Sequence, residues 1–192
     1  PKTFAFNLTW PGSQGIEDNL IWGLATSARR YTVQDSADTQ GGRIVNAMPF
    51  VSAKDPRVPT TKPTAFRFGF DGVTPYDRQD VFPAFNSPVP VANYVDAQLA
   101  LASNTAWLTT LNALRTGPTS SGALNISGMA PLTDPGTQAA RLQLLFRERA
   151  FWTFGRGQRL GDLRRMIRQH GFTPAQVFPG EGGINPRKNA AY

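Results

Sequence analysis

The most regular pattern of apolar and polar positions lies between residues 138 and 170 and predicts two helices. The first is predicted over 138–154, because this stretch contains no Pro or Gly, Thr137 can cap its start and Gly155 can end it. Its buried stripe would consist of Leu142, Leu145, Phe146 and Trp152, flanked by Leu144 and Phe151. A helix this apolar on one side requires a packing partner.

The second helix is predicted over about 159–170, with Leu160, Leu163 and Ile167 facing inward and Gly171 at its end. Arg156 stands between two glycines, in a connection short enough to fold the two helices back on each other. This pattern therefore predicts an αα-hairpin that forms the core of the chain.

A second helical pair is predicted before it. Residues 91–103 carry apolar residues at helical spacing, and a further helix over about 106–115 would bury Trp107, Leu108, Leu111 and Leu114 before Gly117 and Pro118 end it. Residues 116–136 are rich in small and polar residues and read as a surface loop, while 172–183 allow one short helical turn before an open tail.

The first half of the chain has a different texture. Residues 1–90 contain ten prolines and no sustained helical periodicity, whereas 4–10 and 27–33 can form short strands. The segment 55–59 reads as a turn between two prolines, and Phe66, Phe68 and Phe70 would share one face if 65–70 is extended. We predict a mostly α fold with long loops and a few short strands in the N-terminal half. Residues 1–192 would form a single domain, loop- and strand-rich over 1–90 and built of helical hairpins and a tail over 91–192.

Charge is concentrated on the predicted central hairpin. Residues 138–170 hold eight arginines and two acids, a net of +6 in a chain of net +7. This is compatible with a basic surface for nucleic acid or anionic lipid, or with arginines that turn inward toward the acids. We favour the second interpretation, because Glu148 and Asp162 lie among apolar positions and a buried carboxylate needs a cationic partner. The structural ion pairs expected here involve Glu148, Arg149, Arg159 and Asp162.

Several ordered segments resemble SusD/RagB-type (SusD-like) nutrient-uptake proteins of the outer membrane, in their C-terminal portion. They are DPR at 55–57, the stretch 88–117 with WLTTLNALR, PLTDPGT at 131–137, FRERAFWTFGRGQRLGDLRR at 146–165 and NPRKNAAY at 185–192. One departure is AQLALAS at 97–103, which lacks the Arg and Glu of the corresponding helix in the family. The resemblance covers roughly 44–192.

The resemblance implies a tetratricopeptide-like arrangement of helical hairpins in a glycan- or nutrient-binding subunit. Such a subunit works with a TonB-dependent transporter, peripherally in the bacterial cell envelope, at the outer-membrane surface or in the periplasm. Family members are longer and carry an anchoring Cys, and this chain has no Cys and begins at Pro1. We therefore expect that upstream residues are missing.

Nothing in the sequence indicates catalysis. No phosphate-binding glycine loop is present, the absence of Cys excludes thiol chemistry, and the single histidine, His170, is placed to cap a helix end as a cation. We expect a non-enzyme without metal or cofactor, although paired carboxylates far apart in the sequence could still form a hydrolytic site.

Two functions remain open. In the first, the chain binds a glycan or small nutrient through stacking aromatics in its loop-rich half, for which Trp10, Trp22 and Tyr76 are the candidates. In the second, a shortened SusD-like module docks as a structural or accessory subunit on a larger membrane protein complex. Both require an envelope partner, either a TonB-dependent barrel or another complex. Nucleic-acid binding would rest on charge alone, and we do not expect it.

Overall fold

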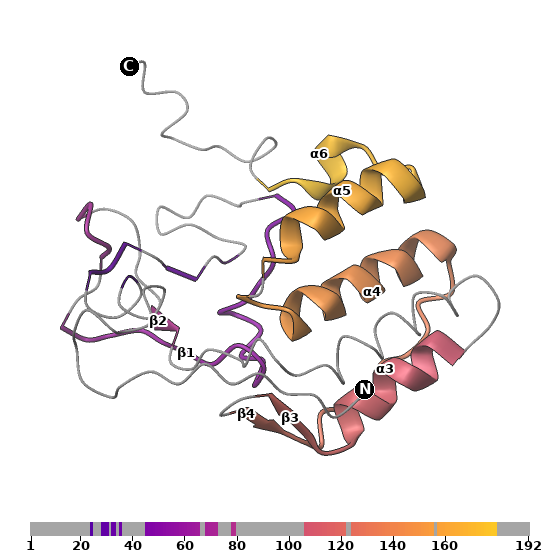
Figure 1. The fold of residues 1–192 in the computed structure, drawn as a ribbon, viewed down its shortest axis with the longest axis horizontal. Coiled ribbons are helices and arrows are strands. Elements are labelled where there is room, and N and C mark those ends of the chain that lie inside the picture. The colour runs from indigo at the N-terminus through magenta and orange to yellow at the C-terminus, as the bar shows by residue number, and fades with distance from the viewer. Residues whose placement is uncertain are drawn as a thin grey trace. The chain divides into compact units, whose positions relative to one another are not determined.

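The computed structural model describes residues 24, 28–30, 32–33, 35, 45–65, 68–72, 78–79, 106–121, 124–155 and 157–179. Within them are four helices, α3 (Ala106–Thr116), α4 (Gln138–Trp152), α5 (Arg159–His170) and α6 (Pro174–Val177) (Figure 1). Four strands of two or three residues each also lie in this part of the chain, two before α3 and two between α3 and α4. This part of the chain is mostly helical, as predicted. Contacts divide the chain into two compact units, Pro1–Thr9 with Val81–Arg159 and Trp10–Asp80 with Leu160–Tyr192. The prediction of a single domain stays a prediction.

In the first unit, α3 and α4 lie side by side (Figure 1) and bury most of the predicted stripes. The buried apolar side chains of the pair are Trp107, Leu111 and Leu114 from α3 and Leu142, Leu145, Phe146, Ala150, Phe151 and Trp152 from α4. Leu108 and Leu144 are half-buried at the edges of these stripes. The helical spacing of the apolar residues therefore predicted both buried faces.

The start of α4 is stabilised by a compact set of polar contacts. The Thr137 hydroxyl accepts the Ala140 N–H at 3.2 Å, which confirms Thr137 as the N-cap. Just before it, Asp134 accepts the Gly136 N–H at 2.9 Å and binds the Arg141 guanidinium through Nε and Nη2 at 2.8 and 2.7 Å. A carboxylate at this end of a helix also complements the helix dipole. The helix ends at Trp152, two residues before the predicted end, and Gly155 follows with φ of 72°.

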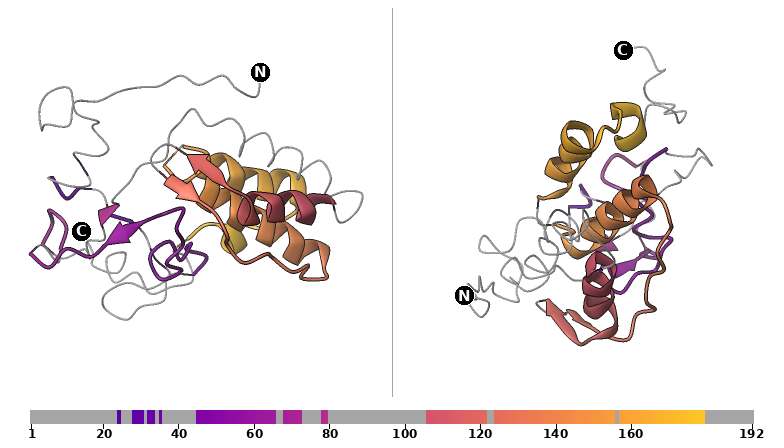
Figure 2. Two further views of the ribbon diagram at one scale, coloured as in Figure 1. Left: turned by 90° about the horizontal axis from the view of Figure 1, so that it is seen from below. Right: turned by 90° about the vertical axis from the view of Figure 1, so that its right-hand side faces the viewer.

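The loop predicted over 116–136 contains a β-hairpin. Strand β3 (Thr119–Ser121) pairs antiparallel with β4 (Leu124–Ile126), beyond the C-terminal end of α3 (Figure 2), and Ile126 is buried. The expectation that all of 116–136 is a loop is therefore wrong at these two strands. The prediction relied on the many small and polar residues of the segment and gave no weight to Thr119 and Ile126, which favour strands. The rest of the segment is held to α3, since Asn112 bonds both the carbonyl and the N–H of Leu132, at 3.0 and 2.7 Å.

Helix α5 begins and ends where the sequence predicts, at Arg159 and His170, and all of it after Arg159 belongs to the second unit. Its buried residues are Asp162, Leu163 and Met166, whereas Leu160 is 50% exposed and Ile167 is half-buried. The inward position predicted for Leu160 is therefore wrong. Gly171 leaves the helix with φ of 71°, and one turn of helix, α6, follows as predicted. Whether α4 and α5 fold back on each other stays a prediction.

Loops in this unit are fastened by side-chain hydrogen bonds. The Asn46 amide donates to the carbonyl of Ala175 in α6 at 2.7 Å, and Asp35 accepts the Ser52 N–H and hydroxyl at 2.7 and 2.8 Å. Strands β1 (Thr60–Thr61) and β2 (Arg78–Gln79) pair antiparallel. The described residues of 27–33 form no strand, contrary to expectation. The strand predicted over 4–10 and the helix predicted over 91–103 lie outside the described residues.

Candidate functional site

The clearest candidate site is a surface pocket of about 410 Å³ in the second unit. Among the described residues, its lining includes Arg29, Arg30, Thr32, Gly69, Phe70 and Asp71. We call it the Arg30–Phe70 pocket. It combines two guanidinium groups, one aromatic ring and one carboxylate, which are chemically varied groups for so small a surface.

Two short segments distant in sequence build this pocket. The Phe70 N–H donates to the Arg29 carbonyl at 2.9 Å, and Arg29 Nη1 donates to the Phe68 carbonyl at 3.4 Å. The Arg30 N–H donates to the Leu24 carbonyl at 2.9 Å, which fastens the arginine segment at its other side. The positions of both arginine backbones are therefore fixed by hydrogen bonds.

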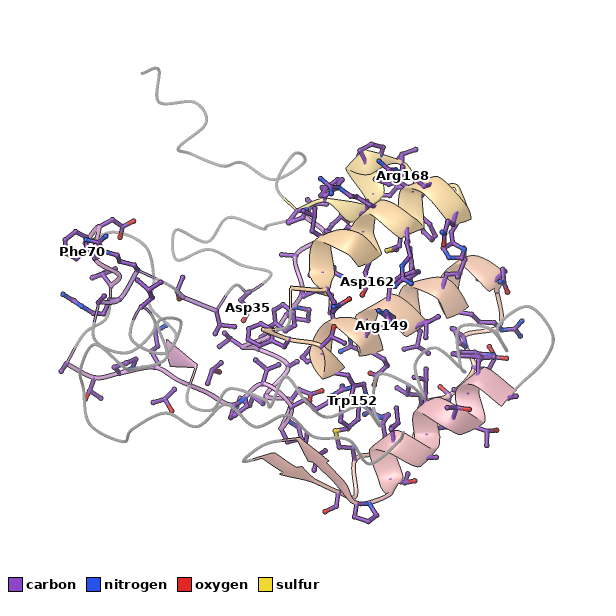
Figure 3. All side chains as sticks on the ribbon, viewed as in Figure 1. Asp35, Phe70, Arg149, Trp152, Asp162 and Arg168 are labelled. Atoms are coloured by element: carbon purple, nitrogen blue, oxygen red, sulfur yellow. The ribbon has the colours of Figure 1, made fainter. Side chains whose placement is uncertain are left out.

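Phe70 lies in a tight turn at the surface (Figure 3). The turn is closed by the Gly72 N–H on the Gly69 carbonyl at 3.0 Å, and Gly72 adopts φ of 69°, which favours glycine. Phe70 is 67% exposed and Phe68 is 43% exposed. An apolar ring held in solvent by a closed turn loses hydrophobic stabilisation, so its exposure suggests a binding role.

The Arg30 guanidinium lies over the Phe70 ring, with Cζ 4.8 Å from the ring centre. This cation–π contact positions the guanidinium and leaves its N–H groups available to a ligand. Arg29 adopts φ of 53°, a conformation that non-glycine residues rarely occupy and that is enriched at functional sites. Together the groups can bind an anion and stack a flat apolar face.

A second hollow, of about 460 Å³, lies on the first unit beside the start of α4. It is lined by Pro131, Leu132, Thr133, Pro135, Ala140, Gln143, Leu144 and Arg147. Most of this lining is apolar, and the Arg147 guanidinium also lies 5.7 Å from the centre of the Phe151 ring. The hollow offers few polar groups to orient a ligand, which makes it the weaker candidate.

The acids of the predicted ion pairs are buried and bound by arginine. Glu148 is 1% exposed and accepts Arg115 Nη1 on both carboxylate oxygens at 3.1 Å. Asp162 is equally buried and accepts Arg165 Nη2 within α5. Arg149 is buried and Arg159 half-buried, and their pairing with these acids stays a prediction. These buried acids and their arginine partners stabilise the fold.

The turn at 55–59 contains a third pair of this kind. Asp55 binds the Arg57 guanidinium through Nε at 2.8 Å and Nη2 at 2.6 Å and also accepts the Arg57 N–H, and Arg57 is 2% exposed. The turn predicted from its prolines is present, with an internal ion pair that the prolines alone did not indicate.

His170 does not act as the cation expected at the end of α5. Burial lowers its pKa, and the positive charge of Arg165 lowers that pKa further. The ring is therefore neutral at pH 7, and the interpretation of His170 as a charged helix cap is wrong at that pH.

The aromatic residues chosen from the sequence, Trp10, Trp22 and Tyr76, lie outside the described residues. Sequence reasoning did not single out Arg29 and Arg30, because it placed both on a strand. The two adjacent arginines and the aromatic run 65–70 were the sequence features that could have indicated a site. Nothing local in the sequence indicated that these two segments meet.

Comparison with known proteins gave no match to a protein-family model, a curated protein or a solved structure. Among the described residues, no helix is long and apolar enough to cross a membrane. That part of the chain also contains no cluster of three His, Asp or Glu side chains suited to a metal ion.

Proposed function

We propose that this chain is a non-enzymatic, SusD-like subunit that binds a glycan or another nutrient for a TonB-dependent outer-membrane transporter. The observation that carries the proposal is the Arg30–Phe70 pocket, where a ring 67% exposed to solvent stands beside two guanidinium groups. Apolar faces of sugar rings stack on exposed aromatic rings, while arginine donates hydrogen bonds to ligand oxygens.

The segments that resemble SusD-like proteins give the second support. In this proposal, the stretch 146–165 and the stretch 88–117 belong to tetratricopeptide-like helical hairpins that serve as the scaffold. Glu148, bound by Arg115, would be part of that scaffold, since this contact joins α3 to α4. The loop-rich half would then provide the ligand contacts, including those of Trp10, Trp22 and Tyr76.

Calorimetric titration with a panel of oligosaccharides tests this function. The wild-type chain should bind at least one member, and Phe70→Ala should weaken binding at least tenfold. Alanine variants at Trp10, Trp22 and Tyr76 test whether these rings contribute. Absence of binding by the folded wild-type chain across the panel, or unchanged affinity in Phe70→Ala, would reject the assignment.

A docking module is the second candidate, favoured by the exposure of both Phe68 and Phe70 in the first half of the chain. In this case the two rings would enter a stable interface of more than about 1,000 Å² with an envelope protein complex. Exposed arginines such as Arg164 and Arg168 would contribute at its rim, so attachment would weaken only modestly with salt. Affinity purification from native membranes, with light scattering on the purified complex, distinguishes the two candidate functions. Docking is favoured if the wild-type chain binds no glycan and recovers a stoichiometric partner that Phe70→Ala does not recover.

A further inference from the structure

We infer that the ligand of the Arg30–Phe70 pocket carries a carboxylate next to an apolar ring face, as the acidic sugar units of a polysaccharide do. This inference rests on the proposed ligand-binding function and names the class of ligand. It follows from the charges, the geometry and the exposed ring of this pocket.

The charges of the lining favour an anion. Among the described lining residues, Arg29 and Arg30 contribute two positive charges and Asp71 contributes one negative charge, a net of +1. The guanidinium group presents a planar fork of N–H donors that matches both oxygens of a carboxylate. Among the described residues, no carboxylate pairs with Arg30. Within this described part of the chain, its fork is open to a carboxylate from a ligand.

The geometry of the pocket holds the Arg30 guanidinium in position before a ligand binds. Stacking on Phe70 at 4.8 Å restricts the Arg30 side chain, and the bond from its N–H to Leu24 fixes its backbone. A restricted arginine loses less conformational entropy when it binds than a freely rotating one. The left-handed backbone conformation of Arg29 also indicates a rigid segment, because such conformations persist only where the surrounding structure requires them.

The remaining groups select a sugar with one charge per unit. The exposed part of the Phe70 ring offers a surface for the C–H face of a sugar ring, and the Asp71 carboxylate can accept hydrogen bonds from hydroxyl groups. Asp71 would also repel a doubly charged phosphate more strongly than a carboxylate. A volume of about 410 Å³ is within the range of small-ligand sites.

The test uses pairs of ligands that differ only in charge. Oligomers of galacturonic, glucuronic and mannuronic acid are titrated calorimetrically into the whole chain, each beside its neutral methyl ester, with a sugar phosphate as a further probe. We expect at least one acid to bind at least tenfold more tightly than its ester, with an affinity that falls as salt is raised.

Three variants complete the design. Arg30→Gln should weaken binding of the acid at least tenfold and binding of the ester to a clearly smaller extent, whereas Phe70→Ala should weaken both. Arg164→Gln removes the same charge from an exposed position in α5 outside the pocket and serves as the matched control. Circular dichroism and the Tm of each variant verify that it is folded.

The possible outcomes distinguish a failure of the carboxylate inference from a failure of the proposed binding function. Equal binding of acid and ester, both lost in Phe70→Ala, would overturn the carboxylate inference and retain the proposed binding function. Tighter binding of the sugar phosphate, or an equal effect of Arg30→Gln and Arg164→Gln, would also overturn it. If neither these ligands nor the neutral panel bind, the proposed function fails together with the inference.

Discussion

At the scale of single residues, the acids of the helical region show what a sequence can reveal about burial. Glu148 and Asp162 lie among apolar positions, and this placement predicted that they would be buried and need arginine. The partner of Glu148 was beyond local reasoning, because Arg115 lies 33 residues earlier and meets it only when α3 packs against α4. A sequence therefore predicts that a buried acid needs a cationic partner more readily than it predicts which residue that partner is.

Removing one member of this pair should be costly. Glu148→Ala leaves the largely buried Arg115 guanidinium without its carboxylate, and we expect a loss of about 3–5 kcal/mol in the free energy of unfolding. The double variant Arg115→Met/Glu148→Leu should lose less free energy of unfolding than Glu148→Ala or Arg115→Met alone, because it removes both charges. Urea unfolding measures all of these. A double variant at least as destabilised as the sum of the singles would contradict a charge-pair role.

His170 should make stability depend on pH in the mildly acidic range. Its folded pKa lies below the unfolded value of about 6.5, so the unfolded chain binds the proton more readily. The contribution of the neutral His170 ring to the free energy of unfolding is complete above about pH 6.5 and declines as the pH falls toward the folded pKa. His170 is the only histidine in the chain, which makes the assignment direct. Unfolding midpoints of wild type and His170→Gln between about pH 5 and 7.5 should converge at low pH, and parallel curves would refute the shift.

At the scale of elements, helical periodicity predicted the helices well and composition predicted the loops poorly. The bounds of α3 and α5 match the expected bounds to within one residue, and Thr137 caps α4. The run 116–136 contains β3 and β4, which strand propensity over three residues is too weak to reveal. Leu160 shows a further limit: it fits the apolar repeat of α5, but tertiary packing buries Met166 and leaves Leu160 half exposed.

The buried stripe of α4 should dominate the stability of its unit. Leu145→Ala and Phe146→Ala should each cost about 2–5 kcal/mol, as buried large-to-small substitutions do. Leu144→Ala is the matched control on the same helix, and its half-buried side chain predicts a clearly smaller loss. Chemical denaturation provides the values. Losses under about 0.5 kcal/mol at both buried sites would contradict the observed packing.

The exposed leucine of α5 gives the opposite expectation. Because Leu160 is 50% exposed, Leu160→Ala should change the free energy of unfolding by less than about 0.5 kcal/mol. The same unfolding measurement on Leu163→Ala, a buried neighbour in α5, should show a substantially larger loss. Equal losses at the two positions would mean that Leu160 is buried in solution, as the sequence pattern first suggested.

At the scale of the whole molecule, the candidate site could not be derived from the sequence. Arg29 and Phe70 are 41 positions apart, and their backbone hydrogen bond joins segments with no shared periodicity. The sequence predicted ligand contacts in the loop-rich half, on the basis of its aromatic residues, and this stays a prediction. Which aromatic ring is exposed depends on a turn closed by Gly69 and Gly72, and this becomes visible only in three dimensions.

The most direct test of the central claim, that the Arg30–Phe70 pocket binds a ligand, is nuclear magnetic resonance of the isotopically labelled chain during titration with an oligosaccharide. We expect the shifts to concentrate on the backbone signals of Arg29, Arg30, Thr32 and 69–71 and on the Arg30 Nε–Hε signal, and to disappear in Phe70→Ala. Shifts confined to other parts of the chain, or unchanged in Phe70→Ala, would contradict it.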